Sequence, residues 1–273
     1  MSRTPFGEPV VPLVPPIADR LLKAAAEKGV SLRGTQIAIS GAMALPHELV
    51  VPFEQASGGY LVEGYGLSEC SPVLIANPVA DNRVPGSVGL PLPGTECRVV
   101  DPDDPARDVA PGTPGELVVR GPQVFGGYHG RPEETTAVFV DGWFRTGDIV
   151  TIDDAGFVRI VDRIKELIIT GGFNVAPTEV ENALRQHPDV DDVAVVGLPS
   201  EHSGEEVVAA VVLAPDVDEP DVEAIRAFAR GILTPYKVPR RVFVVDELPK
   251  SLIGKVLRRQ VREKLLELTG AGS

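Results

Sequence analysis

The sequence of 273 residues predicts an α/β protein in two parts, and three successive patterns along the chain support this prediction. Helical and extended apolar spacing alternate over residues 10–66, as in strands joined by helices. Short β-type runs separated by Pro/Gly turns follow over residues 88–161. Beyond Asp162, helices and strands form an α+β pattern, so we expect a domain boundary there, which divides the chain into 1–161 and 162–273.

The first part begins with a helix that is expected to start after Pro16 and to stop at Gly29. Four apolar residues recur at helical spacing between these points: Ile17, Leu21, Leu22 and Ala25. A short buried strand is expected over residues 37–40, ending at Gly41, and a second helix from position 46 to about 53.

A third strand, over residues 60–62, precedes the tripeptide Gly64-Tyr65-Gly66, for which we expect a tight turn. Ligands of α/β folds bind beyond the carboxyl ends of strands. The turn is therefore a candidate binding site. Further along, residues 97–100, 116–119 and 157–160 predict a small twisted β region.

The second part starts at Asp162, and residues 178–181 have the spacing of a capping box that opens a helix. Strands are expected over residues 193–196, 207–213 and 242–245. Two amphipathic helices are expected from apolar positions on one face: Val222, Ile225 and Phe228 in the first, and Leu257, Val261, Leu265 and Leu268 in the second.

Composition limits the classes of function. The net charge of −13 argues against binding nucleic acid or an anionic membrane through overall charge. Two cysteines, Cys70 and Cys97, without CxxC spacing argue against a disulfide framework and a zinc site. No apolar run has membrane-spanning length and Met1–Pro5 is not typical of a signal peptide, so we expect a cytoplasmic protein.

Two distant motifs carry the chemistry: Glu63-Gly-Tyr-Gly-Leu-Ser-Glu69 and Leu248-Pro-Lys-Ser-Leu-Ile-Gly-Lys255. Together they resemble motifs of the adenylate-forming acyl-CoA ligases. Members of this family activate a carboxylate with ATP as an acyl-adenylate and pass the acyl group to a thiol. The resemblance implies an incomplete AMP-binding domain with a small β subdomain over 1–161, and a mobile C-terminal lid domain over 162–273.

The first motif is expected to hold AMP. By the resemblance, Tyr65 stacks on adenine, while Gly64, Gly66 and Leu67 belong to the nucleotide-binding loop. Glycine permits close approach of the backbone. Ser68, where the family usually has threonine, would contact the α-phosphate. Glu69 would bind Mg²⁺, which takes carboxylate and phosphate oxygens. Gly41, in the partly matching stretch 40–45, would lie beside adenine. Without the resemblance, the motif would be a solvated turn.

Asp148, in the stretch Gly142–Asp148, matches the family aspartate that binds both ribose hydroxyls. A carboxylate suits a vicinal diol because it only accepts hydrogen bonds and has two oxygens. The alternative is a residue of an Asx-type turn. Trp143, the only tryptophan, is expected in the core rather than at the ligand.

The boundary region carries three further matches. Arg163 would contact ribose or phosphate, and Lys165 is the expected hinge, since hinges need only a few residues. Gly171 and Gly172 would line the tunnel for the pantetheine arm of coenzyme A. Alternatively, Lys165 is an exposed charge and the two glycines form a flexible turn.

Lys255 matches the catalytic lysine of the family, and Lys250 is the competing candidate. An ammonium group between a carboxylate and an α-phosphate offsets their repulsion by about 4 kcal/mol at ~4 Å and an effective dielectric of ~20. Rotation about Lys165 would present Lys255 for adenylation and then the glycine pair for thioester formation.

The family's phosphate loop, a Ser/Thr/Gly-rich segment ending in lysine, is not found in the sequence. The resemblance therefore covers about the second half of a family enzyme, and we expect a truncated or split chain that cannot form acyl-adenylate alone. A truncated core would expose apolar sheet edges, so we expect self-association or pairing with the missing N-terminal half.

The residues around Glu63–Pro72, Ser87–Pro91 and Phe125–Tyr128 are most similar to bacterial long-chain fatty-acyl-CoA ligases. The implied reaction converts a fatty acid, ATP and coenzyme A into acyl-CoA, AMP and pyrophosphate. An aryl-CoA ligase or another adenylate-forming enzyme is the alternative within the family. The non-enzymatic alternative is a degenerate fragment that binds nucleotide or a partner chain.

Overall fold

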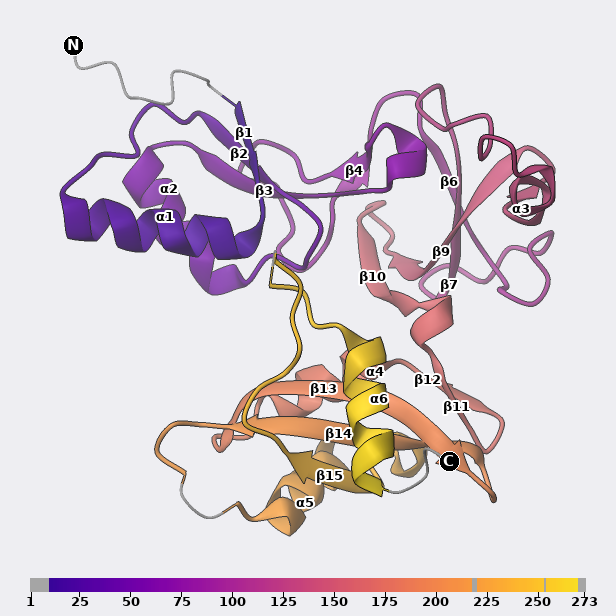
Figure 1. Ribbon diagram of the computed structural model, residues 1–273. Coiled ribbons are helices and arrows are strands. Elements are labelled where there is room, and N and C mark those ends of the chain that lie inside the picture. The colour runs from indigo at the N-terminus through magenta and orange to yellow at the C-terminus, as the bar shows by residue number, and fades with distance from the viewer. Residues whose placement is uncertain (1–9, 218–219, 253, 270–273) are drawn as a thin grey trace. The chain divides into compact units, whose positions relative to one another are not determined.

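The computed structural model describes residues 10–217, 220–252 and 254–269. The predicted start, Met1–Pro5, and Ile253 of the lysine motif lie outside these ranges. The chain divides into two compact units, Met1–Ile160 and Val161–Ser273 (Figure 1). Sheets and helices mix in both, so the predicted α/β class is confirmed. Among the described residues, none of the helices has the length and apolar character needed to cross a membrane.

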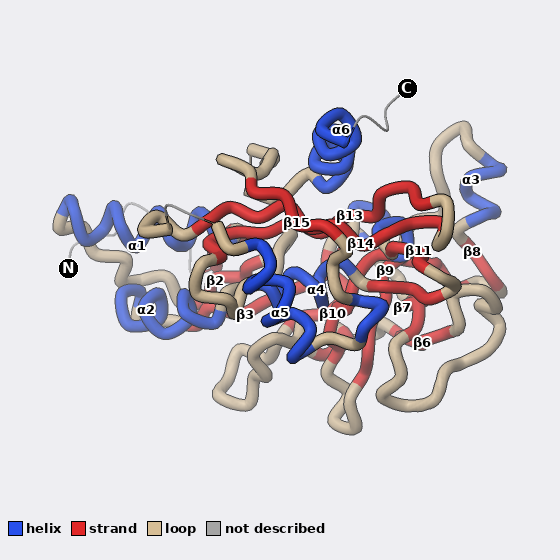
Figure 2. Tube along the Cα trace, turned by 90° about the horizontal axis from the view of Figure 1, so that it is seen from below, coloured by secondary structure: helices blue, strands red, loops and turns tan. Residues whose placement is uncertain are grey.

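Unit 1 begins with a parallel layer. Strands β1 (Val10–Leu13), β2 (Ile37–Ser40) and β3 (Tyr60–Gly66) pair in parallel in this order. Helices α1 (Pro15–Lys28) and α2 (His47–Ser57) lie side by side next to this layer (Figures 1 and 2). Four fully buried residues form their shared core: Ala18, Ala38, Phe53 and Leu61.

The local signals explain these elements. A proline opens α1, where its missing N–H costs nothing, and Gly29 ends it in the left-handed conformation with φ 61°. The strand over 37–40 is confirmed. The second helix extends to Ser57, beyond the predicted end near Phe53, and stops where Gly58 adopts φ 76°.

The predicted tight turn at Gly64–Gly66 is wrong, because β3 continues through these residues. They pair with β4 (Val73–Ala76), which in turn pairs with β5 (Leu90–Pro91). A Cβ atom on Gly66 would lie 1.8 Å from the Pro72 carbonyl oxygen, so glycine here allows two backbone segments to meet. The chain turns one step later, at the 3₁₀ helix η1 (Ser68–Cys70).

The predicted β region is a second sheet of unit 1, with strands in the order β10-β9-β7-β6 and β8 paired to β9. Its elements are β6 (Glu96–Val100), β7 (Gly115–Arg120), α3 (Pro132–Ala137), β8 (Phe139–Val140), β9 (Trp143–Ile152) and β10 (Val158–Arg163). Trp143 is half-buried, with Arg98 and Arg120 at 5.2 and 4.7 Å from its ring. The expected core position belongs instead to Phe144, the next residue along the strand, because successive side chains point to opposite faces.

Unit 2 is built on a five-stranded sheet in the order β12-β11-β14-β13, with β15 parallel to β14. Its strands are β11 (Ile168–Thr170), β12 (Phe173–Val175), β13 (Val190–Ser200), β14 (Gly204–Leu213) and β15 (Arg241–Val244). Its helices are α4 (Pro177–Leu184), α5 (Val222–Ile232) and α6 (Arg258–Thr269), with short 3₁₀ helices η2 (Ile164–Glu166) and η3 (Pro235–Lys237).

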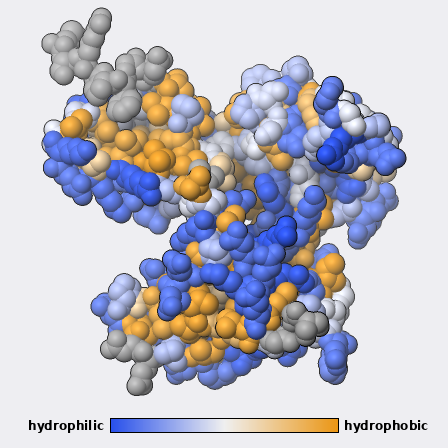
Figure 3. Space-filling view, in the orientation of Figure 1, coloured by the Kyte–Doolittle hydropathy of each residue, from blue (hydrophilic) through white to orange (hydrophobic). Residues whose placement is uncertain are grey.

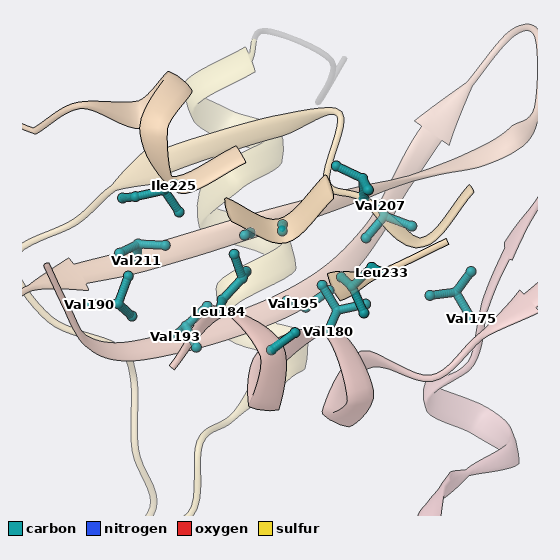
Figure 4. Packing of buried hydrophobic residues seen from close by; sticks show 14 of the residues in the cluster. Val175, Val180, Leu184, Val190, Val193, Val195, Val207, Val211, Ile225 and Leu233 are labelled. Atoms are coloured by element: carbon teal, nitrogen blue, oxygen red, sulfur yellow. The ribbon is translucent and has the colours of Figure 1, made fainter. Parts of the chain in front are cut away.

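Both faces of this sheet are buried, so residues 193–198 of β13 and 207–213 of β14 are all apolar. Val207 and Val211 pack toward α4 and α5, in the cluster that Figure 4 shows, whereas Val208 and Ala210 pack toward α6. Figure 2 shows α6 on one side of the strands and α4 and α5 on the other. The outward face of α6 is hydrophilic (Figure 3), as expected of an amphipathic helix.

The predicted capping box at 178–181 is wrong. Helix α4 starts at Pro177, so Thr178 lies inside its first turn. The Thr178 N–H donates to Asp162 Oδ2 at 2.8 Å. A carboxylate from outside the helix therefore satisfies an amide that a capping side chain would otherwise bind.

Candidate active site

The Tyr65 hydroxyl donates a hydrogen bond of 2.5 Å to Asp148 Oδ2, across 83 positions of sequence. Tyr65 lies near the end of β3 and Asp148 within β9, and Asp148 is only 2% exposed. Burial, and then the charge of Asp148, raise the pKa of Tyr65, so the hydroxyl keeps its proton and acts as a donor. Two of the predicted nucleotide-binding residues are thus in direct contact.

Asp148 lies within strand β9, next to an irregularity in the pairing of this strand with β7. Gly147 adopts φ 72° there, and its N–H donates to Glu116 Oε1 at 3.2 Å. The Asp148 N–H donates to Thr146 Oγ1 at 3.1 Å. Such a bulge redirects a side chain, which explains how a strand residue is aimed at Tyr65.

Glu69 lies in η1 and is held by a segment that the sequence did not assign to the site. The Tyr128 hydroxyl donates to Glu69 Oε1 at 2.9 Å, and the Phe125 N–H donates to the Glu69 carbonyl at 2.8 Å. The rings of Phe125 and Tyr128 also pack edge to face, with their centroids 4.9 Å apart. From the sequence, Phe125–Tyr128 indicated only a similarity to the family. Tyr128 was therefore not predicted as a site residue.

The described residues contain no group of three or more His, Cys, Asp or Glu side chains that could hold a metal ion. A site for Mg²⁺ here would therefore need oxygen ligands from a bound nucleotide. Glu69 fits that role, because a carboxylate has lone pairs to spare while it accepts from Tyr128. Ser68, the first residue of η1, is exposed beside it.

The glycines of the predicted nucleotide-binding loop differ in how much room a Cβ atom would have at each position. A Cβ on Gly41 would lie 3.7 Å from the Gly64 carbonyl oxygen, which is ordinary contact, and one on Gly64 would lie 3.3 Å from Ile39 Cγ2. Only Gly66 is demanded by internal packing, as described above. Leu67 is half-buried against the core cluster, so a ligand would meet its main chain rather than its side chain.

Glu63 is a buried acid that the sequence did not single out as a site residue. Glu63 is 9% exposed, and its Oε1 accepts from the Leu45 N–H at 3.3 Å. Burial raises the pKa of Glu63 from 4.5 to about 7, although the bond from Leu45 opposes the shift. Glu63 pairs with Ser40 in the register of β2 and β3. A titratable carboxyl group therefore lies next to the stretch 40–45, which contains Gly41.

In unit 2, Arg163 ends β10 and is exposed, while Lys165 lies in η2. The Arg163 N–H donates to Asp162 Oδ1 at 2.8 Å. Gly171 and Gly172 form the two-residue loop of the β11–β12 hairpin, with φ 57° and 82°. Positive φ at both positions is the requirement of a type I′ turn. No atom lies within 4 Å of a Cβ built on either glycine.

Lys255 lies in a loop that precedes α6, and main-chain bonds hold the loop. The Ser251 N–H donates to the Lys255 carbonyl and the Leu257 N–H to that of Pro249, both at 2.8 Å. Lys255 and Lys165 line one groove of about 620 Å³ on unit 2. Lys250, the competing lysine, pairs with Asp192 at 2.7 Å and is not among the residues that line this groove.

Comparison with known proteins gives two family matches. Residues 9–129 match the AMP-binding enzyme model and residues 179–255 match the AMP-binding enzyme C-terminal domain. A long-chain-fatty-acid–CoA ligase of Escherichia coli O157:H7 is 47% identical over 229 residues, which cover 84% of this chain and 40% of the relative. That of Bacillus subtilis is 46% identical with the same coverage. A rice 4-coumarate–CoA ligase-like 9 is 40% identical over 264 residues, 94% of this chain and 47% of the relative.

Solved structures agree in fold. ATP-bound MatB from Rhodopseudomonas palustris superposes with a TM-score of 0.83 at 36% identity, over 95% of this chain and 51% of that one. The amide bond synthetase McbA from Marinactinospora thermotolerans has a TM-score of 0.81 at 34% identity, over 94% and 52%. The chain thus spans about two fifths of the bacterial relatives named here and half of these structures.

Proposed function

Because the chain belongs to the AMP-binding enzyme family, we propose that it supplies the nucleotide-binding and lysine-bearing parts of a fatty-acyl-CoA ligase. The overall reaction would convert a long-chain fatty acid, ATP and coenzyme A into acyl-CoA, AMP and pyrophosphate. The chain spans only part of its relatives, so this activity is proposed for a complete enzyme that contains these residues.

The contact between Tyr65 and Asp148 carries the proposal. Asp148 is an acceptor-only group, and its two oxygens suit the two hydroxyls of a ribose. Tyr65 can keep its ring against adenine while its hydroxyl holds the carboxylate from one side. A nucleoside is the ligand that uses an aromatic face and a neighbouring carboxylate together.

Glu69 would bind Mg²⁺ together with phosphate oxygens of the nucleotide. The metal would supply charge that offsets the phosphates. The protein's part is to fix the carboxylate, which Tyr128 does through its hydroxyl bond. Ser68 would donate its hydroxyl to the α-phosphate from the exposed start of η1.

Lys255 would stabilise adenylation. When a fatty-acid carboxylate approaches the α-phosphate, two anions must come together, and an ammonium group between them lowers that repulsion. The loop bonds around Ser251 and Leu257 limit the positions that Lys255 can take. Rotation of unit 2 at Lys165 would then replace Lys255 at the nucleotide by the Gly171–Gly172 turn. The pantetheine arm of coenzyme A would pass beside this turn. Arg163 would contact the ribose or a phosphate of the nucleotide.

The choice of a fatty acid rests on the identity of 46–47% with the bacterial long-chain ligases. An aryl acid is the second candidate, because the rice 4-coumarate–CoA ligase-like relative matches 94% of the chain at 40% identity. Calorimetric titration with non-hydrolysable acyl-adenylate analogues that carry a hexadecanoyl or a coumaroyl group would separate the two. Tighter binding of the coumaroyl analogue would reject the fatty-acid proposal.

AMP binding tests the site itself. We expect Asp148→Ala to weaken AMP binding about tenfold or more, since a hydrogen bond to a charged group contributes roughly 1.5–3 kcal/mol. Asp108→Ala is the matched control in the same unit, because its exposed carboxylate pairs only with Arg98 among the contacts described. Equal AMP affinity of the wild-type chain and Asp148→Ala would contradict the proposed site. Binding without any turnover in a complete enzyme would favour the non-enzymatic fragment.

A further inference from the structure

Arg258, the first residue of α6, joins three segments of unit 2. Its Nε and Nη2 donate to the two oxygens of Glu181 at 3.0 and 2.8 Å, and Nη2 also donates to Thr178 Oγ1 at 3.0 Å. Its Nη1 donates to Glu166 Oε2. A planar guanidinium with five donors can serve all these acceptors at once, which a lysine cannot do.

The pairs are shielded from water. The side chains of Arg258, Glu181 and Glu166 are 21%, 5% and 27% exposed. Glu181 Oε1 also accepts from the Val195 N–H at 2.9 Å, so the network is anchored to β13. Burial by itself would lower the pKa of Arg258, but Glu181, Glu166 and Asp162 outweigh it and raise the pKa, so the guanidinium stays charged.

The two ends of this network lie next to the residues that the proposed function uses. Glu166 directly follows Lys165, the proposed hinge, and Arg258 comes three residues after Lys255. The bond from the Leu257 N–H to the Pro249 carbonyl, at 2.8 Å, ties the residue before Arg258 into the Lys255 loop. A continuous set of bonds therefore runs from the hinge segment to this loop.

We propose that Arg258 is a positioning residue that clamps the Lys255 loop to the hinge segment 164–166. The inference rests on the proposed function, in which Lys165 is the pivot and Lys255 the group that must arrive at the reacting atoms. If Lys165 and Lys255 are linked rigidly, a rotation at Lys165 carries Lys255 to one defined position. An error of about 1 Å in such a group is costly for catalysis.

The neighbouring arginine provides a matched comparison. Arg259 has a side chain that is 92% exposed, and it pairs with Glu263 one turn along α6. Exposed pairs of this kind contribute little to stability. Replacing one arginine or the other thus removes the same functional group from adjacent positions of one helix, but only Arg258 belongs to the network.

Amide hydrogen exchange of the 273-residue chain tests the clamp. We expect Arg258→Met to speed exchange about tenfold or more in two separate segments, 162–168 and 249–257, because removing the guanidinium leaves the buried Glu181 and the partly buried Glu166 without this charge partner. Arg258→Lys keeps the positive charge but not the planar guanidinium, and it should give a smaller increase of exchange in both segments. Arg259→Met should change neither. An increase spread evenly over unit 2, or none in these segments, would overturn the proposal.

Glu166→Gln provides a test that keeps α6 anchored, because the pair of Arg258 with Glu181 remains. If Arg258 is a clamp, this change at the hinge must speed exchange at 249–257 as well as at 162–168. If Arg258 only anchors α6, exchange will change at 162–168 alone, and the proposal is wrong. These measurements use no nucleotide, so a failure of AMP binding would reject the proposed function and leave the clamp to be judged by exchange.

Discussion

The Tyr65 hydroxyl and the Asp148 carboxylate are joined by a hydrogen bond of 2.5 Å between the two sheets of unit 1. Tyr65 comes from β3 of the first sheet and Asp148 from β9 of the second. The core cluster beneath them mixes residues of both sheets, including Leu74, Ile75 and Leu117. The candidate nucleotide site thus lies at a junction that neither sheet forms alone.

Removal of the Tyr65 hydroxyl tests this junction. We expect Tyr65→Phe to lower the free energy of unfolding by roughly 1–3 kcal/mol, because the bond involves a charged and largely buried acceptor. Urea denaturation measures the change. Tyr60→Phe is the control. Arg83 lies over the Tyr60 ring, 5.3 Å from its centroid, and phenylalanine keeps this ring. Equal stability of the two variants would show that the Tyr65 bond contributes nothing to the junction.

Glu63 should make stability depend on pH. The folded state binds its proton more tightly than the unfolded chain, because its pKa is about 7 instead of 4.5. Its contribution is therefore most favourable below pH 4.5 and is lost as the pH rises toward 7. Relative to wild type, Glu63→Gln should gain on the order of 3 kcal/mol across this window.

Chemical denaturation of both proteins at several pH values measures this gain, and titrations common to both cancel in the difference. Glu96→Gln is the control. Its exposed carboxyl has a pKa lowered by the hydrogen bond from Arg120, so its contribution to stability is lost as the pH falls below the window rather than as it rises through it. A constant difference between Glu63→Gln and wild type would contradict the prediction.

Three glycines should respond differently to alanine. Gly66→Ala should destabilise unit 1 by about 3 kcal/mol, because the new Cβ would meet the Pro72 carbonyl oxygen at 1.8 Å and backbone cannot move aside easily. Gly171→Ala has room, but its φ of 57° costs about 1–2 kcal/mol. Gly231→Ala, within α5 and without close neighbours, should stabilise by up to about 1 kcal/mol. Thermal unfolding ranks the variants, and a different order would refute these physical assignments.

The isolated chain is expected to release no pyrophosphate above background when it is given ATP, Mg²⁺ and a fatty acid. Its sequence has no Ser/Thr/Gly-rich segment ending in lysine to grip the departing phosphates. A coupled pyrophosphate assay, with a complete long-chain ligase as positive control, measures the rate. Turnover by the chain that disappears in Lys255→Ala would show that the missing loop is not needed.

The sequence by itself determined the family and part of the secondary structure, although it did not predict α3 or β8. The end of α1 at Gly29, the strand over 37–40 and the α+β pattern after Asp162 all follow from local periodicity and from glycine and proline chemistry. The motifs around Tyr65 and Lys255 indicated the family, and the comparisons bear this out.

Only the tertiary structure decided which side chains meet. The bonds of Tyr65 with Asp148, of Tyr128 with Glu69 and of Arg258 with Glu181 each join residues at least 59 positions apart. Such pairs depend on strand register, on the bulge that aims Asp148 and on how helices pack, and no local pattern encodes these. The same reason explains two of the wrong local predictions. A distant partner extended β3 through Gly66, and the distant Asp162 replaced the expected cap of α4.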